Sequence, residues 1–363
     1  MKNKNIYPWL VVAMLWGVAL LNYMDRQMLS TMKSAMQVDI IELQSATNFG
    51  RLMAVFLWIY GLMSPISGII ADRMNRKWLI VGSLFVWSVV TSLMGEAETF
   101  QQIYWLRALM GVSEALYIPA GLSLIADYHT GKSRSLAVGI HMTGLYTGQA
   151  IGGFGATVAA AFSWNTTFHW FGIIGIVYAL LLMIFLKDKK SSFAETKTES
   201  SASPKEKKSL FKGLGMLFSN LSFWIILLYF AAPSLPGWAT KNWLPTLFAD
   251  SLNIPMSQAG PIATITIAVS SFIGVIAGGI LSDKWVQKNI RGRVYTGAIG
   301  LGMTIPSLLL LGYGSGLISV VGAALCFGIG YGLFDANNMP ILCQFVSSKN
   351  RATAYGVMNM VGV

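Results

Sequence analysis

The chain has 363 residues, of which 54% are hydrophobic and only 11% are charged, and its formal net charge is +11 at pH 7. Soluble domains carry about 25% charged residues, so this composition excludes an ordinary water-soluble protein. The apolar residues fall in runs of roughly 18 to 30, long enough for helices to cross the ~30 Å hydrocarbon core of a bilayer. Because the runs lack the alternation typical of a β-barrel, the sequence predicts an all-α polytopic membrane protein.

Six helices are expected before a polar segment, and further helices after it. We place the first six near 9–32, 47–71, 77–95, 99–127, 133–160 and 166–186. The next four fall near 218–248, 258–282, 294–313 and 316–346, and an eleventh begins at 351. The chain would then consist of an N-terminal six-helix bundle (1–187), a cytoplasmic basic linker (188–216) and a C-terminal bundle (217–363).

The polar segment from Lys187 to Lys212 is rich in Lys, Ser, Glu and Thr. It cannot bury a hydrophobic core, so we expect a flexible linker. Its positive charge would also attract anionic membrane lipid, although a solvated tether is the simpler interpretation.

Two short patterns occur twice in the chain. The segment 68–73 reads GIIADR and returns as GILSDK at 279–284, which is 211 positions later. The pattern Arg-x-x-Ala-x-Gly at 134–139 returns 217 positions later at 351–356. Such internal similarity indicates two copies of one multi-helix bundle. In a membrane, two bundles that face each other enclose a space that opens to either side, which is the architecture of a transporter.

The same alignment places Val363 opposite Tyr146, in the middle of the fifth helix. About one and a half helices of the second bundle then have no counterpart. We therefore expect a C-terminal bundle of about four and a half helices that is truncated in helix 11, and a sequence that is part of a longer protein.

The basic residues indicate the orientation in the membrane. With the N-terminus in the cytoplasm, 21 of the 26 Lys and Arg residues lie on the cytoplasmic side. The remaining five are Arg26, Lys33, Arg51, Arg107 and Lys241. This distribution follows the positive-inside rule, so the positive net charge reports topology and does not indicate a nucleic-acid partner.

Four charged residues of the first bundle fall inside membrane-spanning segments. They are Asp25 and Arg26 in the first helix, and Arg107 and Glu114 in the fourth. Because an ionisable group in a bilayer costs on the order of several kcal/mol, each is a functional candidate. Asp25 and Arg107 are expected at similar depths, and Glu114 lies two turns deeper on the same face as Arg107.

These residue types suit the coupled movement of an anion and a proton. Arginine presents a planar fork that binds a carboxylate or phosphate bidentately. Burial favours the protonated form of a carboxyl group, whereas a neighbouring guanidinium favours the ionised form. We hypothesise that Arg26 or Arg107 binds an anionic substrate while Asp25 and Glu114 carry protons. The alternative is a set of structural ion pairs between the first and fourth helices, with Arg107 as the strongest structural candidate.

Other polar residues within the helices are weaker candidates for substrate binding. Tyr60, Gln149 and Asn337 would bind substrate hydroxyls, and Tyr146, Asn242, Trp243 and Asn338 have the same potential. The alternative for each is an interhelical hydrogen bond. Asp335 is interpreted either as a second proton site or as a cap on an irregular helix.

The repeated loops are interpreted as conformational latches. The gating candidates are Asp72, Arg73, Arg76, Asp283 and Lys284. Asp72 would pair with basic or helix-terminal groups when the cytoplasmic side is closed, and breaking that contact would favour inward opening.

Several classes of protein are disfavoured by what the sequence lacks. The three histidines show no metal-ligand spacing, and there is no glycine loop of the P-loop kind. We also find no nucleophile and base pair. We therefore expect no metal, no cofactor, no ATP-driven step and no enzymatic activity.

Four segments carry a resemblance to a known family. GIIADRMNRK resembles the signature loop between helices 2 and 3 of the major facilitator superfamily, with Asn75 where a glycine is usual. NYMDRQMLS, LRALMGVSEALYIPAG and NWLPTLF are similar to the anion:cation symporter branch, which includes hexuronate and galactonate carriers. The pieces DRMNRK and GVSEALYIP are equally similar to spinster-type lipid transporters.

The resemblance implies two pseudo-symmetric bundles. It also implies substrate and proton roles for the positions of Asp25, Arg26, Arg107 and Glu114, as in galactonate-type carriers. The resulting expectation is a monomeric, proton-coupled symporter in a bacterial cytoplasmic (inner) membrane. It would import a small organic anion, a sugar acid such as a hexuronate or aldonate, by alternating access. The alternatives are a spinster-like transporter of lysolipid or another amphiphile, and a non-transporting sensor or inactive fragment.

Overall fold

The computed structural model describes residues 6–129, 133–188, 218–314, 316–345 and 351–362, and these residues form helices and turns without any β-strand. Within the described residues, nine helical segments are long and apolar enough to cross a membrane, and one of them, Phe100–Ile125, comprises two consecutive helices. This confirms the predicted all-α polytopic fold. The predicted linker at 188–216 falls, apart from Asp188, outside the described residues.

The first part of the chain forms the predicted helices with short additional ones. Its elements are α1 (Tyr7–Thr31), α2 (Lys33–Asp39), the 3-10 helix η1 (Ile41–Gln44), α3 (Ala46–Arg73), α4 (Arg76–Met94), α5 (Phe100–Ala115), α6 (Tyr117–Tyr128), α7 (Ser133–Gly152), α8 (Gly155–Ala161) and α9 (Trp164–Phe185). We refer to α1–α9 as the N-terminal half.

The second part contains longer, proline-containing helices. Its elements are α11 (Leu221–Leu252), α12 (Met256–Val286), α13 (Gly292–Tyr313), α14 (Leu317–Phe345) and α15 (Arg351–Gly362). We refer to α11–α15 as the C-terminal half. The repeated motifs take equivalent places in the two halves, because one pair ends α3 and α12 and the other pair begins α7 and α15.

Two helices that the sequence predicts as continuous are interrupted. The helix expected at 99–127 is divided at Leu116 into α5 and α6. Pro119 explains this break, because it has no backbone N–H to donate to the carbonyl of Ala115, four residues earlier. The helix expected at 133–160 is divided after Gly152 into α7 and α8, where two consecutive glycines favour a turn. The prediction of unbroken helices was wrong at these two points.

Glycines bring α7 close against α1. A Cβ atom on Gly144 would lie 2.6 Å from the carbonyl oxygen of Trp16, and one on Gly152 would lie 2.7 Å from that of Met24. Gly148, between them, faces the carbonyl of Leu20. A stripe of small residues permits this close packing of membrane helices. The helix that carries Asp25 and Arg26 is therefore fixed against α7.

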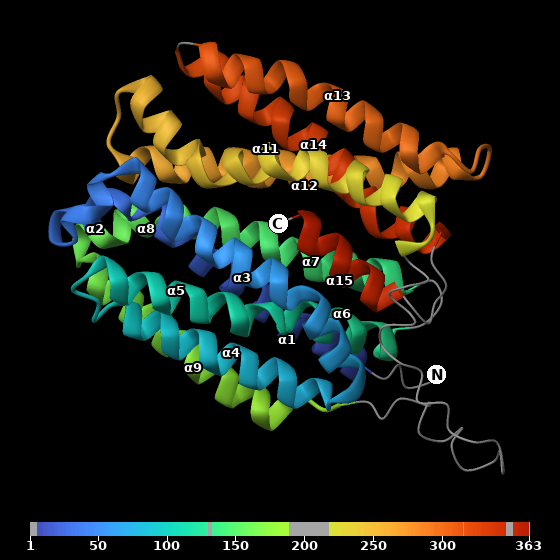
Figure 1. The fold of residues 1–363 in the computed structure, drawn as a ribbon, viewed down its shortest axis with the longest axis horizontal. Helices are drawn as coiled ribbons and strands as arrows, with labels where there is room; N and C mark the ends of the chain where they lie inside the picture. Colours follow the sequence, from blue (N-terminus) through green and yellow to red (C-terminus); the bar gives the residue numbers. More distant parts are fainter. Residues whose placement is uncertain (1–5, 130–132, 189–217, 315, 346–350, 363) are drawn as a thin grey trace.

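The two halves meet along several helices. In Figure 1, α11–α14 form one group beside the N-terminal half, and α15 lies against α3. Further contacts join α7 and α8 to α12, and α1 to α11. The side chains of Ser64 on α3 and Asn359 on α15 form a hydrogen bond of 2.9 Å across this boundary.

Candidate functional site

Four buried charged residues lie on α1 and α5 of the N-terminal half. Asp25 and Arg26 come from α1, and Arg107 and Glu114 from α5. None of them is more than 7% exposed, and Glu114 is completely buried. Because unpaired charges are rarely buried, the partners of these four side chains decide what they can do. We refer to the four residues as the buried charge cluster.

A direct ion pair joins Arg26 to Glu114. The Nε atom of Arg26 donates to Oε2 of Glu114 at 2.6 Å, which is the short distance of a charge-assisted hydrogen bond. Among the described residues, Nη2 of Arg26 and Oε1 of Glu114 have no hydrogen-bond partner. The pair links α1 to α5 and leaves both groups with unused capacity for a ligand.

Aromatic rings surround the two guanidinium groups. The guanidinium carbon of Arg26 lies 4.9, 4.7 and 4.6 Å from the ring centroids of Tyr23, Phe56 and Tyr60. That of Arg107 lies 4.2 Å from the centroid of Phe56, so this ring contacts both arginines. Cation–π contacts of this kind stabilise a charge that has lost its water.

Asp25 and Arg107 have other partners. Oδ2 of Asp25 accepts a hydrogen bond of 3.3 Å from the Thr91 hydroxyl of α4. Nη1 of Arg107 donates to the sulfur of Met110 at 3.0 Å. Within the described part of the chain, no carboxylate lies within 4.0 Å of Arg107. Arg26 and Glu114 are therefore brought into direct contact, whereas Asp25 and Arg107 are not paired.

Of the three weaker substrate-binding candidates from the sequence, one lies in this site and two lie on other helices. Tyr60 stacks on Phe56 and contacts Arg26, so it belongs to the same site. Gln149 on α7 is buried, and Asn337 on α14 donates to the carbonyl oxygen of Leu333. No contact between either of these two residues and the buried charge cluster is seen among the described residues.

Tyrosines from both halves lie around Asp335 of α14. Tyr146 of α7 lies within hydrogen-bonding reach of this carboxylate. Tyr23 of α1, Tyr331 of α14 and Tyr355 of α15 interact with it electrostatically. All four rings are partly buried, whereas Asp335 is exposed. We refer to these four residues as the inter-half tyrosine cluster.

Sequence reasoning named Tyr60 but missed Tyr23 and Phe56, the other aromatic residues of the site. Tyr23 lies three positions before Arg26, and Phe56 lies four positions before Tyr60, so helical spacing alone points to both. Thr91 gave no signal of its own, because a single hydroxyl in an apolar helix is common.

The gating candidates are described only in part. Arg76 at the start of α4 forms an ion pair with Asp127 near the end of α6. Asp72 and Arg73 end α3, and Asp283 and Lys284 lie near the end of α12. Lys284 is exposed, and the side chains of the other three lie outside the described residues.

An aromatic contact joins the halves near the opposite end of α3. Nζ of Lys33 lies 5.1 Å from the ring centroid of Phe49 and 5.6 Å from that of Trp243. The two rings pack edge to face with centroids 5.6 Å apart. Because Trp243 belongs to α11, this contact closes the boundary between the halves at that end.

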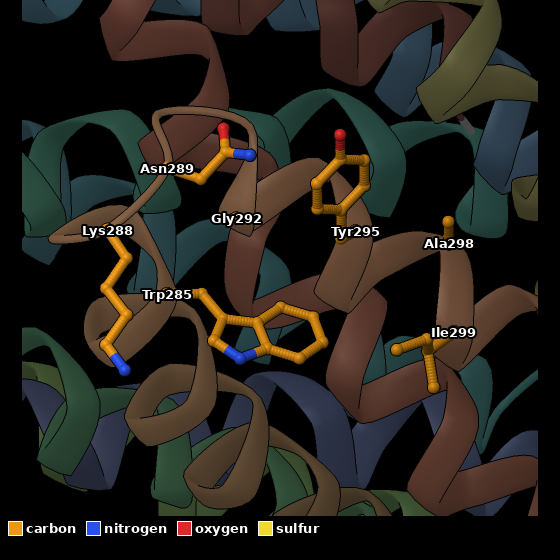
Figure 2. A pocket seen from close by; sticks show the side chains of 7 residues that line it. All are labelled: Trp285, Lys288, Asn289, Gly292, Tyr295, Ala298 and Ile299. Carbon is orange, nitrogen blue, oxygen red and sulfur yellow. The ribbon is translucent and has the colours of Figure 1, made fainter.

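Two surface pockets lie elsewhere. One of about 540 Å³, between the end of α12 and the start of α13, has Trp285, Lys288 and Tyr295 among its lining residues, and Figure 2 shows their side chains. A polar pocket of about 600 Å³ has Lys33 and Asp250 in its lining. None of the binding or proton-carrying candidates from the sequence lines either pocket. We therefore place the candidate site at the buried charge cluster, because its charged side chains can bind an anion and carry protons.

Comparisons with known proteins agree with this architecture. A family model described as Major Facilitator Superfamily matches residues 15–363. The chain is 27% identical to a hexuronate transporter of Bacillus subtilis (strain 168) over 339 residues, covering 90% of this chain and 76% of the relative. It is 26% identical to the sphingosine-1-phosphate transporter SPNS2 of Mus musculus over 367 residues, covering 93% of this chain and 64% of the relative.

A solved structure has a similar fold. It is the crystal structure of a bacterial homolog to the human lysosomal transporter spinster, in an inward-facing and unoccupied conformation. It matches with a TM-score of 0.79 and 21% identity, covering 99% of this chain and 80% of the other. The family match and the relatives named as transporters together show that the chain is an integral multi-pass membrane protein and a transporter of small molecules, which confirms the expectation that it is not an enzyme.

Proposed function

This chain belongs to the Major Facilitator Superfamily, and from that premise we propose that it couples proton movement to the uptake of a small organic anion. The substrate class is a sugar acid, such as a hexuronate or an aldonate. Transport proceeds by alternating access of one site to the two sides of the membrane. The relatives named as a hexuronate transporter and as a probable L-galactonate transporter of Escherichia coli (strain K12), at 27% and 24% identity, support this class.

The ion pair between Arg26 and Glu114 carries the proposal. Among the described residues, Nη2 of Arg26 has no hydrogen-bond partner, and the guanidinium is held by three aromatic rings and one carboxylate. A substrate carboxylate would add to that free nitrogen and compete with Glu114 for the same guanidinium. Arg107 has no carboxylate partner within the described residues and is the second candidate for the anion.

Competition for Arg26 supplies the coupling rule. When a substrate carboxylate takes the guanidinium, Glu114 loses the neighbour that stabilises its ionised form. In a buried site the glutamate then takes up a proton, because an uncompensated buried carboxylate is costly. Asp25, whose Oδ1 has no partner among the described residues, is the second proton carrier. One anion and its proton thereby move together.

A Glu114→Gln variant tests this function. The chain is reconstituted in liposomes, and the uptake of labelled glucuronate and galactonate is measured with and without an inward proton gradient. The wild type should accumulate one of these acids and lose accumulation when the gradient collapses. The variant should exchange internal for external substrate but fail to accumulate it. Accumulation by the variant at the wild-type level would remove Glu114 from the coupling role.

A matched control is available at Glu98, an exposed residue beside the start of α5. Glu98→Gln removes the same charge outside the buried cluster. It should leave accumulation and exchange unchanged. Failure of the wild type to transport any sugar acid would contradict the proposed substrate class.

A second candidate is an amphiphile such as a lysolipid. The aromatic rings around Arg26 favour it, since they offer apolar surface next to a cation, and the 26% identity to a sphingosine-1-phosphate transporter agrees. Direct uptake separates the two. Uptake of a labelled short-chain lysophospholipid, supplied below its critical micelle concentration, without uptake of labelled glucuronate or galactonate would favour the amphiphile.

We also propose the setting of this activity. The positive-inside distribution supports an N-terminus in the cytoplasm. The relatives from Bacillus subtilis and Escherichia coli are consistent with a bacterial inner membrane, and we propose a monomer of two bundles divided near 188–216. The latch residues Asp72, Arg73, Arg76, Asp283 and Lys284 then lie at the cytoplasmic end. An Asp72→Asn variant should lower turnover while substrate affinity, measured by titration, is retained.

A further inference from the structure

A turn rich in basic residues joins α12 to α13 in the C-terminal half, on other helices than the buried charge cluster. Its basic residues are Lys284, Lys288, Arg291 and Arg293, and positions 284–293 contain no Asp or Glu. Lys284, Lys288 and Arg291 are exposed, and none of these three forms an ion pair within the described residues. Basic side chains next to a membrane-spanning helix attract anionic lipid headgroups.

The turn lies where two candidate membrane spans end. One span comprises Met256–Val286, and the next comprises Gly292–Tyr313. The residues between them, 287–291, therefore lie at the boundary between lipid and water, because each adjoining helix is long enough to cross the hydrocarbon core. The opposite end of α13 has no charged residue between 310 and 316. The basic residues thus mark one membrane surface at this helix.

The pocket of about 540 Å³ described above opens beside this turn. Its lining residues at the turn are Trp285, Lys288 and Asn289, and along α13 they include Tyr295, Ala298 and Ile299. Figure 2 shows the indole of Trp285 between the side chains of Lys288 and Ile299. The part lined by α13 extends from Gly292 to Ile299, which is about 10 Å at 1.5 Å per residue. The hollow therefore runs from the membrane surface into the depth of the span.

Backbone hydrogen bonds fix the shape of the turn. The N–H groups of Lys288 and Asn289 donate to the carbonyl oxygen of Trp285 at 2.9 and 2.7 Å, and that of Gly292 donates to Asn289 at 2.8 Å. A Cβ atom on Gly292 would lie 2.6 Å from the Cβ atom of Trp285, so a glycine is required for α13 to begin directly against this tryptophan. The backbone at the mouth of the pocket is therefore held in place.

The lining suits an amphiphile with an anionic head. Lys288 lies at the mouth, whereas the deeper wall is mostly apolar, and Tyr295 and Ile299 are 44% and 47% exposed. Tryptophan and tyrosine side chains favour the headgroup level of a bilayer, where one end of the ring is wet and the other is not. A free phosphate or a sugar acid would leave the apolar wall uncovered. A hollow bordered by basic residues also distinguishes this position from a smooth apolar helix face.

We propose that this pocket binds one anionic phospholipid from the membrane leaflet that adjoins the α12–α13 turn. The lipid phosphate contacts Lys288, and the glycerol backbone lies against Trp285 and Tyr295. One acyl chain follows Ala298 and Ile299 along α13. The proposal is independent of the transported substrate, because it involves neither the buried charge cluster nor the boundary between the halves.

Native mass spectrometry of the purified full chain in detergent tests this site. The protein is titrated with phosphatidylglycerol and with phosphatidylcholine of identical acyl chains, and the affinity for the first bound lipid is compared. The wild type should prefer phosphatidylglycerol by about fivefold, the contribution of one basic residue near a lipid headgroup. Lys288→Gln removes the basic group, and Ala298→Trp fills the pocket from an exposed position of α13. Each variant should reduce the preference to below about twofold.

Lys187→Gln is the matched control, because it removes an exposed lysine just after α9 that does not line the pocket. It should keep the wild-type preference, and an equal loss in this variant would replace the pocket with a general attraction to the basic surface. Equal binding of the two lipids by the wild type overturns the proposal without any variant. A preference that survives in Ala298→Trp overturns it as well, since the headgroup would then bind outside the pocket. Glycerol 3-phosphate in large excess should not displace phosphatidylglycerol, and displacement would indicate a site for a soluble anion instead of a lipid.

Discussion

At the scale of single residues, Phe56 has the most unusual surroundings in the N-terminal half. Its ring lies within 4.7 Å of the guanidinium carbon of Arg26 and 4.2 Å of that of Arg107. Two like charges this close to one ring repel each other, and Glu114, which contacts Arg26, also interacts electrostatically with Arg107. Among the described residues Arg107 has no carboxylate within 4.0 Å, so its guanidinium is the one without a direct competitor for an incoming anion.

Replacement of Arg26 by lysine tests whether the guanidinium shape matters. Lysine keeps the charge but loses the planar fork and its stacking on aromatic rings. A lost charge-assisted hydrogen bond costs about 1.5–3 kcal/mol, so sugar-acid affinity should fall roughly 10- to 100-fold. The affinity is measured by titration of the purified chain. Arg51→Lys, at an exposed arginine of α3, is the matched control and should bind normally. Unchanged affinity in Arg26→Lys would mean that only the charge is recognised.

At the scale of helices, the contact between α1 and α7 positions the site. Gly144, Gly148 and Gly152 form one stripe, and each faces a backbone carbonyl of α1. No side chain fits there without separating the helices. Since α1 carries Asp25 and Arg26, a shift of α1 would move both away from α5.

Gly148→Ala is therefore expected to destabilise the fold. The added methyl group would collide with the backbone of Leu20, and overpacking of this kind costs about 1–3 kcal/mol. The midpoint of thermal unfolding in detergent should fall, and sugar-acid binding should weaken with it. Gly82→Ala, at a helical glycine with open space around it, should leave the midpoint unchanged within error. Equal midpoints for the two variants would show that α1 and α7 can separate at little cost.

The aromatic contact of Lys33, Phe49 and Trp243 is the element that closes one end of the boundary. The Trp243→Ala variant loses one cation–π contact with Lys33 and one edge-to-face contact with Phe49, worth about 1–2 kcal/mol together. The population opened at that end should rise roughly 5- to 30-fold. Spin labels at Val38 of α2 and Ser251 of α11 would report a longer distance.

Trp58→Ala serves as the control for that experiment. Trp58 is 66% exposed on α3 and contacts none of the three residues in the boundary contact. Its variant should keep the wild-type distance distribution. A longer distance in both variants would indicate general loosening, and an unchanged distance in Trp243→Ala would exclude the contact as a gate.

At the scale of the whole molecule, transport by alternating access requires the two halves to move relative to each other. The boundary between them includes the Ser64 and Asn359 hydrogen bond, which joins α3 to α15. If the site opens alternately to the two sides, this contact must break in each cycle.

A crosslink across this contact should stop transport. Ser64→Cys and Asn359→Cys are introduced together after Cys326 and Cys343 are replaced by serine. A short thiol-specific crosslinker should abolish uptake, and a reducible version should allow its recovery. Ser64→Cys alone should remain active under the same treatment. Full uptake by completely crosslinked protein would show that α3 and α15 move as one unit.

The sequence determined the class of this protein and most of its helices. Long apolar runs leave a membrane helix as the only backbone structure that satisfies its own polar groups, so periodicity and length suffice. The charges at Asp25, Arg26, Arg107 and Glu114 were recognisable as candidates for the same reason, because their cost in a bilayer is a local property. The break at Leu116 could have been predicted from Pro119, which has no backbone N–H to donate.

Only the tertiary structure decided which groups meet. Arg26 and Glu114 are 88 positions apart, and nothing in either local pattern selects Glu114 over Asp25 as the partner of this arginine. Likewise, Asp335 reads as one acidic residue in an apolar helix until the packing of α1, α7 and α15 places tyrosines around it. Local patterns encode what a segment costs in water or lipid, whereas pairing across helices depends on the rotation and depth of each helix, which packing alone determines.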